Sequence, residues 1–103
     1  MPIRRLDRTQ TEFVAVDDRR REPRVPAEGI VHLYPDDPGL RAVVGVLLDV
    51  SAGGFRAAHD CAELKTGDEL GFVHPQGFGR ARIMWNRIVG GRLESGFLVL
   101  TES

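Results

Sequence analysis

The 103-residue sequence contains one cysteine, Cys61, one lysine, Lys65, and no long apolar run. A single cysteine excludes an intramolecular disulfide and is typical of a reducing compartment. No segment approaches the roughly 20 apolar residues that a membrane-spanning helix requires, and the polar N-terminus lacks the apolar stretch of a signal peptide. The sequence therefore predicts a cytoplasmic protein without a membrane span.

The sequence also lacks the spacings of common metal and catalytic sites. Neither C-x-x-C nor H-x-x-x-H occurs among the four candidate metal ligands, which are His32, His59, Cys61 and His74. Ser51 does not lie in a G-x-S-x-G nucleophile motif, because Asp49 stands where the first glycine is required. No Walker glycines precede Lys65. We therefore expect neither a metal site nor an enzyme.

What the sequence does contain is a series of short β-prone segments separated by turn residues. These segments are 29–34, 42–48, 55–58, 69–73, 80–86 and 95–100, and no amphipathic helical pattern stands out. In 80–86, strict alternation would place Ala81, Ile83 and Trp85 on one face, which favours a core position for Trp85. The pattern predicts an all-β protein, either a small antiparallel barrel or a sandwich. Residues 1–18 are polar and are predicted to form a flexible N-terminal arm.

The basic residues are almost all arginines, and seven of them lie within the first 24 residues. Arginine suits bidentate contact with phosphate or guanine and can stack on a base, although a codon bias toward arginine would raise its frequency equally well. The net charge of −1 gives no general attraction to nucleic acid.

Two short patterns carry the candidate chemistry. The first, R-R-x-x-R, comprises Arg20, Arg21 and Arg24, with Arg19 just before it; the second, D-x-S-x-x-G, comprises Asp49, Ser51 and Gly54 and is predicted to form a loop. Arginines can neutralise phosphates and contact or stack on guanine, whereas a carboxylate can accept from the N1–H and N2–H₂ donors of guanine. Glycines such as Gly53 and Gly54 would let a ligand approach the backbone. Taken alone, the arginines also fit a solvated arm, and the second pattern fits a plain turn.

In this order the two patterns resemble the signature of PilZ domains, which are bacterial receptors for cyclic di-GMP. The resemblance extends to 81–85 and 90–97, and it covers roughly residues 19–100. It implies that residues 19–103 form a small six-stranded antiparallel β-barrel. A second R-R-x-x-R match, 4–8, lies farther from the first predicted strand than Arg24 does, so the motif is assigned to the later match.

The resemblance implies that Arg20, Arg21 and Arg24 hold phosphates and guanine faces, that Asp49 and Ser51 read a guanine edge, and that Gly54 holds the loop open. Arg19, Gly53 and Trp85 are weaker candidates, the last as a stacking surface. It also implies a non-enzymatic receptor that uses no cofactor, changes conformation on binding and signals to an unidentified protein partner in motility, exopolysaccharide or biofilm control.

One feature departs from the family. Many PilZ domains end in a helix packed against the barrel, whereas this sequence stops at Ser103, just after the last predicted strand. Either the helix is absent, or the arm or a second copy covers the barrel edge. Two alternatives remain, a nucleic-acid-binding β-barrel and a PilZ-like adaptor without ligand. The net charge disfavours the nucleic-acid-binding protein, and the intact motif disfavours the adaptor.

Overall fold

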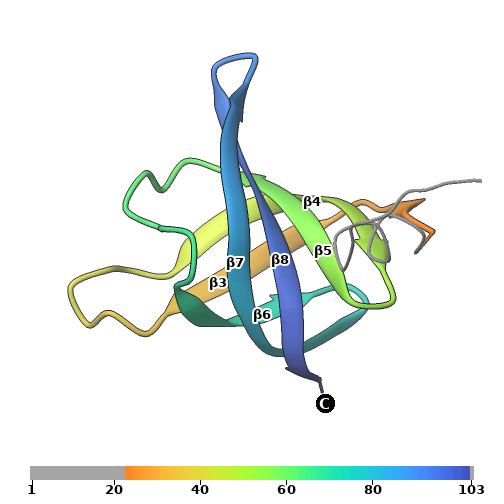
Figure 1. Ribbon diagram of the computed structural model, residues 1–103, viewed down its shortest axis with the longest axis horizontal. Helices are drawn as coiled ribbons and strands as arrows, with labels where there is room; N and C mark the ends of the chain where they lie inside the picture. Colours follow the sequence, from red (N-terminus) through yellow and green to blue (C-terminus); the bar gives the residue numbers. More distant parts are fainter. Residues whose placement is uncertain (1–22, 103) are drawn as a thin grey trace, which may run out of the picture.

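The computed structural model describes residues 23–102 (Figure 1). The predicted arm, 1–18, and the predicted start of the domain at 19 lie outside these residues. The described strands are β2 (Val25–Pro26), β3 (Ile30–Pro35), β4 (Val43–Ser51), β5 (Gly54–His59), β6 (Glu69–His74), β7 (Gly77–Val89) and β8 (Arg92–Glu102). Every predicted strand is confirmed, and the two-residue β2 is an addition.

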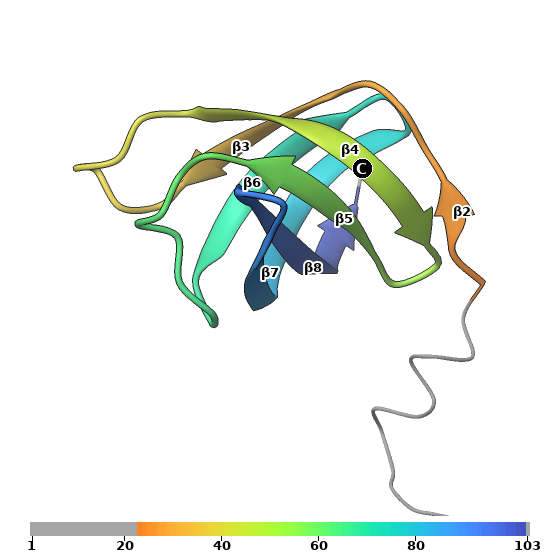
Figure 2. The ribbon, with the colours of Figure 1, turned by 90° about the horizontal axis from the view of Figure 1, so that it is seen from above.

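The strands close into a six-stranded antiparallel barrel. Hydrogen-bonded neighbours follow the order β4-β3-β6-β7-β8-β5, and β5 pairs again with β4 (Figures 1 and 2). The short β2 extends the edge of β4 on the side that β3 occupies farther along. Closure removes the open sheet edges that would otherwise invite pairing with other chains. The all-β prediction is therefore confirmed; within residues 23–102 there is no helix, and hence none able to cross a bilayer.

The barrel interior is filled by inward-facing apolar side chains from every long strand. Phe55 lies near its middle, with its ring centroid 4.6 Å from that of Phe97 and 4.9 Å from that of Phe72. Aliphatic side chains surround these rings, including fully buried Val31 and Leu33. Stacked and tilted aromatic contacts of this kind add to the stabilisation from apolar burial.

Within residues 23–102 the strand pairing contains three register shifts, of which one, between Arg80 and Ala81, makes Leu100 of β8 an extra residue. The other two change the face of predicted site residues. In β4 the register shifts between Leu47 and Asp49, so Leu48 is an extra residue, and in β7 it shifts between Ile83 and Trp85, so Met84 is extra. A bulge adds one residue to one strand, and every following side chain then changes face. Ala81 and Ile83 are in the core as predicted, but the expectation that Trp85 shares their face is wrong because of this bulge.

The hairpin of β7 and β8 extends beyond the barrel (Figure 1). Its turn is Gly90–Gly91, as predicted, with φ values of 58° and 83° that glycine adopts readily. The sequence prediction ended β7 at residue 86, whereas the strand continues to Val89. The last residues pack on no core, so they carry no alternating pattern from which to predict them; Ile88 is 73% exposed.

A buried polar network closes the end of the barrel near this hairpin. His59 Nδ1 accepts a hydrogen bond from the Cys61 N–H at 3.1 Å, so its proton is on Nε2 and is donated to Ser95 Oγ at 2.7 Å. Ser95 in turn donates to Asn86 Oδ1, and Asn86 Nδ2 donates to the Leu64 carbonyl oxygen. The bond from the Cys61 N–H requires a neutral His59, because a protonated imidazole has no acceptor nitrogen.

A second buried histidine, His74, stacks on Phe72 and accepts the Gln76 N–H at 3.1 Å. Burial lowers the pKa of both His59 and His74, and the neighbouring Asp60 and Glu102 charges oppose this only in part. The folded state therefore prefers both imidazoles neutral.

The free energy of unfolding should consequently fall as the pH drops through about 6.5, the usual histidine pKa. In that window the unfolded chain binds more protons than the folded chain, so stability is complete above it and is lost toward pH 5. Urea unfolding between pH 7.5 and 5, followed by the fluorescence of Trp85, measures this slope. The His59→Gln/His74→Gln double variant should show a shallower slope, and a wild-type stability that is flat or rises toward pH 5 contradicts the prediction.

Candidate functional site

The D-x-S-x-x-G motif forms a β-hairpin rather than the predicted open loop. Asp49 and Ser51 lie within β4, the turn is formed by residues 52–53, and Gly54 begins β5. Val50 pairs with Phe55 and both pack toward the core, so their neighbours Asp49 and Arg56 point to the outer surface. The bulge at Leu48 therefore places Asp49 on the outer face of the barrel.

The two half-motifs meet at this face. β2 pairs with the end of β4, with Pro26 opposite Asp49, which brings the preceding Arg24 beside the carboxylate. Arg24 Nη1 donates to Asp49 Oδ1 at 3.0 Å. The last arginine of R-R-x-x-R and the first residue of D-x-S-x-x-G, 25 positions apart, thus form an ion pair.

A further arginine, Arg56, holds the second oxygen of the same carboxylate. Its Nε and Nη2 lie 3.0 and 2.9 Å from Asp49 Oδ2, and its Nη1 lies 3.3 Å from Glu94 Oε1. The Asp49 side chain is only 10% exposed, because the two guanidinium groups cover it. A carboxylate this enclosed stays in place through its charged hydrogen bonds.

Glu94 extends the cluster to the β7–β8 hairpin. Arg87 Nη2 lies 3.3 Å from Glu94 Oε1, and the Arg87 guanidinium sits 4.9 Å from the centroid of the Trp85 ring. Trp85 pairs with Gly96, and a Cβ at Gly96 would come within 2.3 Å of the indole. The indole therefore lies flat against β8 on the outer face, where the sequence pattern alone had favoured the core.

We call this set the outer-face cluster; it consists of Arg24, Asp49, Arg56, Trp85, Arg87 and Glu94. Three guanidinium groups against two carboxylates leave one positive charge, beside an aromatic ring and a carboxylate that can accept two donors. Such a set suits a ligand that carries phosphates, a stacking base and a donor edge. Residues 23–102 contain no group of three or more His, Cys, Asp or Glu placed to bind a metal.

The glycine and serine candidates have structural partners in the hairpin. A Cβ on Gly54 would lie 2.0 Å from the Phe97 carbonyl oxygen, so glycine here permits close approach of β8. Gly53 accepts the Val99 N–H through its carbonyl at 2.9 Å. Ser51 Oγ, on the same face as Asp49, lies 3.5 Å from the Gly54 carbonyl oxygen. Their suggested ligand contacts stay predictions.

Three of the predicted site residues, Arg19, Arg20 and Arg21, lie outside the described residues. Conversely, the sequence analysis missed Arg56, Arg87 and Glu94. The register of the two hairpins would have predicted them, because a two-residue turn fixes which residues lie opposite each other. A turn at 52–53 pairs Asp49 with Arg56, and a turn at 90–91 pairs Arg87 with Glu94. Both pairs follow from turns that the sequence already marks.

No family model matches the sequence, and no curated protein sequence matches it. Among solved structures, the chain is similar to the Bacillus subtilis inhibitor of motility (MotI/DgrA), with a TM-score of 0.69 and 14% identity over 82% of this chain and 44% of that one. This chain thus spans less than half the length of that protein. It is also similar to the PilZ domain with c-di-GMP of YcgR from Escherichia coli, with a TM-score of 0.63 and 21% identity over 81% of this chain and 79% of the other.

Both likenesses concern the barrel and not the identity of individual site residues. They agree with the closed six-stranded topology. The chain therefore has the fold of a PilZ domain.

Proposed function

We propose that this chain is a receptor for cyclic di-GMP, not an enzyme, and that the ligand binds at the outer-face cluster. The observation that carries the proposal is the ion pair between Arg24 and Asp49, which joins the R-R-x-x-R and D-x-S-x-x-G motifs at one place. The solved PilZ domain of YcgR, similar in fold, is described with c-di-GMP. In this proposal Arg20 and Arg21, with Arg19 near them, reach the same face from the adjoining segment.

Binding would exchange ion pairs rather than fill an empty site. Without ligand, Asp49 is paired with Arg24 and Arg56. A guanine edge offers the carboxylate two N–H donors, and the ligand phosphates offer the arginines new partners. Ser51 lies two residues from Asp49 on the same face and would add a short polar contact, while Trp85 would supply a stacking surface.

The exchange also suggests how binding is signalled. Arg24 adjoins the segment that carries Arg20 and Arg21. On binding, its guanidinium group would move from the Asp49 carboxylate to a ligand phosphate. The new surface, formed by that segment, the ligand and the barrel, is then available to a partner protein. The name of MotI/DgrA as an inhibitor of motility makes motility control the first process to examine.

Isothermal titration with cyclic di-GMP tests the proposal. We expect saturable binding by the wild type, no comparable binding of GTP, and an affinity at least about tenfold lower in Arg21→Ala, because a charge-assisted phosphate contact is lost. Arg41→Ala provides a control, since Arg41 is an arginine outside both motifs. Absence of binding by the wild type would overturn the receptor proposal, and a salt-sensitive band shift with RNA would then favour a nucleic-acid module.

A further inference from the structure

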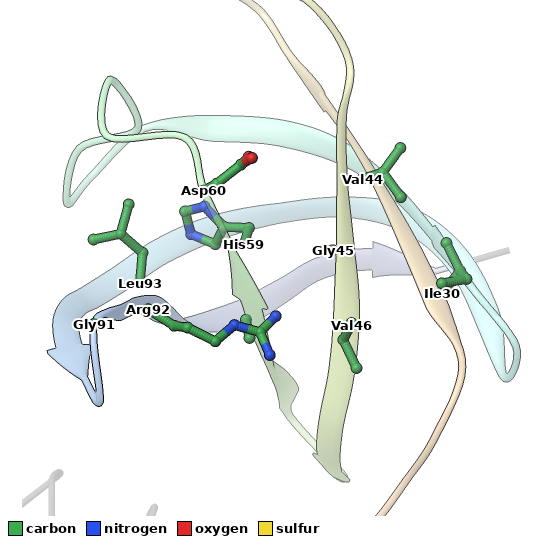
Figure 3. A pocket seen from close by; sticks show the side chains of 10 residues that line it. Ile30, Val44, Gly45, Val46, His59, Asp60, Gly91, Arg92 and Leu93 are labelled. Atoms are coloured by element: carbon green, nitrogen blue, oxygen red, sulfur yellow. The ribbon is translucent and has the colours of Figure 1, made fainter.

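A groove lies on the outer surface next to the projecting hairpin, and it borders the outer-face cluster where its lining residue Ala58 pairs with Glu94. Its volume is about 470 Å³. One wall is formed by apolar side chains of β3 and β4, and the other by the start of β8 (Figure 3). The wall residues Ile30, Val44 and Val46 are 51%, 57% and 39% exposed, which is unusual for neighbouring aliphatic residues on a soluble domain.

The projecting β7–β8 hairpin of the same chain is also apolar at its tip, as the groove wall is. The tip of the β7–β8 hairpin extends beyond the barrel and presents Ile88, 73% exposed, and Val89, 44% exposed (Figure 1). An apolar projection and an apolar groove on one chain are complementary between copies. In a two-fold dimer each contact occurs twice, which helps the interface reach the roughly 800 Å² per subunit typical of stable complexes.

Charge at the groove points to the same occupant. Asp60 and Arg92 both line it, and Arg92 extends across it toward Val46 (Figure 3). Within residues 23–102, neither side chain takes part in an ion pair. Arg92 follows directly after the hairpin turn, so a hairpin that enters a second groove brings Arg92 toward that groove's Asp60.

We propose that two copies of this chain form a symmetric dimer in which each hairpin tip occupies the groove of the other copy. Ile88 and Val89 of one copy contact Ile30, Val44 and Val46 of the second. Arg92 of each copy pairs with Asp60 of the other. The interface does not include Asp49, but it adjoins Arg87 and Glu94 of the outer-face cluster through the same hairpin.

Analytical ultracentrifugation of the full chain tests this dimer. The wild type should be dimeric at about 100 µM. Ile88→Glu at the tip and Val44→Glu in the groove should each raise the dissociation constant at least about 30-fold, because each places a charge in an apolar contact. Phe78→Glu is the matched control: Phe78 is 52% exposed but does not line the groove, and its replacement should leave the dimer intact. Thermal unfolding checks that each variant is folded.

A charge exchange identifies the pairing between copies. Arg92→Asp and Asp60→Arg, each alone, should weaken the dimer, because like charges then meet twice. Mixing the two variants should restore the dimer. In the mixed dimer, the Asp introduced at position 92 of one chain faces the Arg introduced at position 60 of the other, and the native Arg92 of the second chain faces the native Asp60 of the first. A monomeric wild type, a Val44→Glu variant with wild-type association, or a mixture that stays monomeric would each overturn the proposal.

Discussion

Replacing Gly54 with alanine is expected to destabilise the barrel by about 3 kcal/mol or more, which is a large share of the stability of a small domain. The added Cβ would lie 2.0 Å from the Phe97 carbonyl oxygen and 3.1 Å from its carbonyl carbon. These are backbone atoms of the paired strand, so they cannot move aside without separating β5 from β8. Urea unfolding of Gly54→Ala at pH 7.5 measures the loss.

Gly71→Ala is the matched control, because Gly71 is also a strand glycine but a Cβ there would have its nearest neighbours at 3.7 Å, an ordinary contact. That variant should keep wild-type stability. The comparison also separates two roles for the motif glycine. If Gly54→Ala is as stable as wild type yet loses ligand affinity, then the glycine acts at the ligand and the structural explanation is wrong.

Asp49→Ala is expected to lower the affinity for cyclic di-GMP about 100-fold, the effect of losing a hydrogen-bonded charged acceptor. The sharper expectation concerns selectivity. Cyclic di-AMP carries the same phosphates but lacks the N1–H and N2–H₂ donors of guanine, so the wild type should bind it poorly. In Asp49→Ala the two nucleotides should bind with similar affinities, because Arg24 and Arg56 remain for the phosphates. Titration calorimetry with both nucleotides measures the ratio.

Asp36→Ala serves as the control for removing an ion-paired carboxylate. Asp36 binds Arg80 through two hydrogen bonds, and this pair is exposed at the surface. Its loss should change neither affinity nor selectivity. An Asp49→Ala variant that still prefers the guanine nucleotide would show that another group reads the base, even if the receptor function itself holds.

The sequence predicted the strands well because turns and β-prone runs are local features. Each long strand lies where its segment indicated, and the turns at 65–68 and 90–91 are confirmed. The ends of β7 and β8 were missed because beyond the barrel no face is buried and no pattern remains. β2 was missed because two residues, Val25 and Pro26, carry no periodicity.

The candidate site was predicted in part. The motifs indicated Arg24 and Asp49, and the structure brings the two together. The position of Trp85 was wrong because strict alternation cannot reveal the extra residue at Met84. Glu94 was missed since its role depends on register across strands rather than on a short motif.

The bulge at Leu48 has a consequence for how the gene can change. The residues on either side of it, Leu47 and Asp49, pair with the consecutive residues Ala57 and Arg56 of β5. Loss of the Leu48 codon would therefore let Asp49 follow Leu47 in regular alternation, so that its carboxylate would still face outward opposite Arg56. What the deletion would remove is the Leu48 carbonyl oxygen, which accepts the Ala27 N–H. We expect such a loss to spare the Asp49–Arg56 pair and to weaken the attachment of the segment that follows β2.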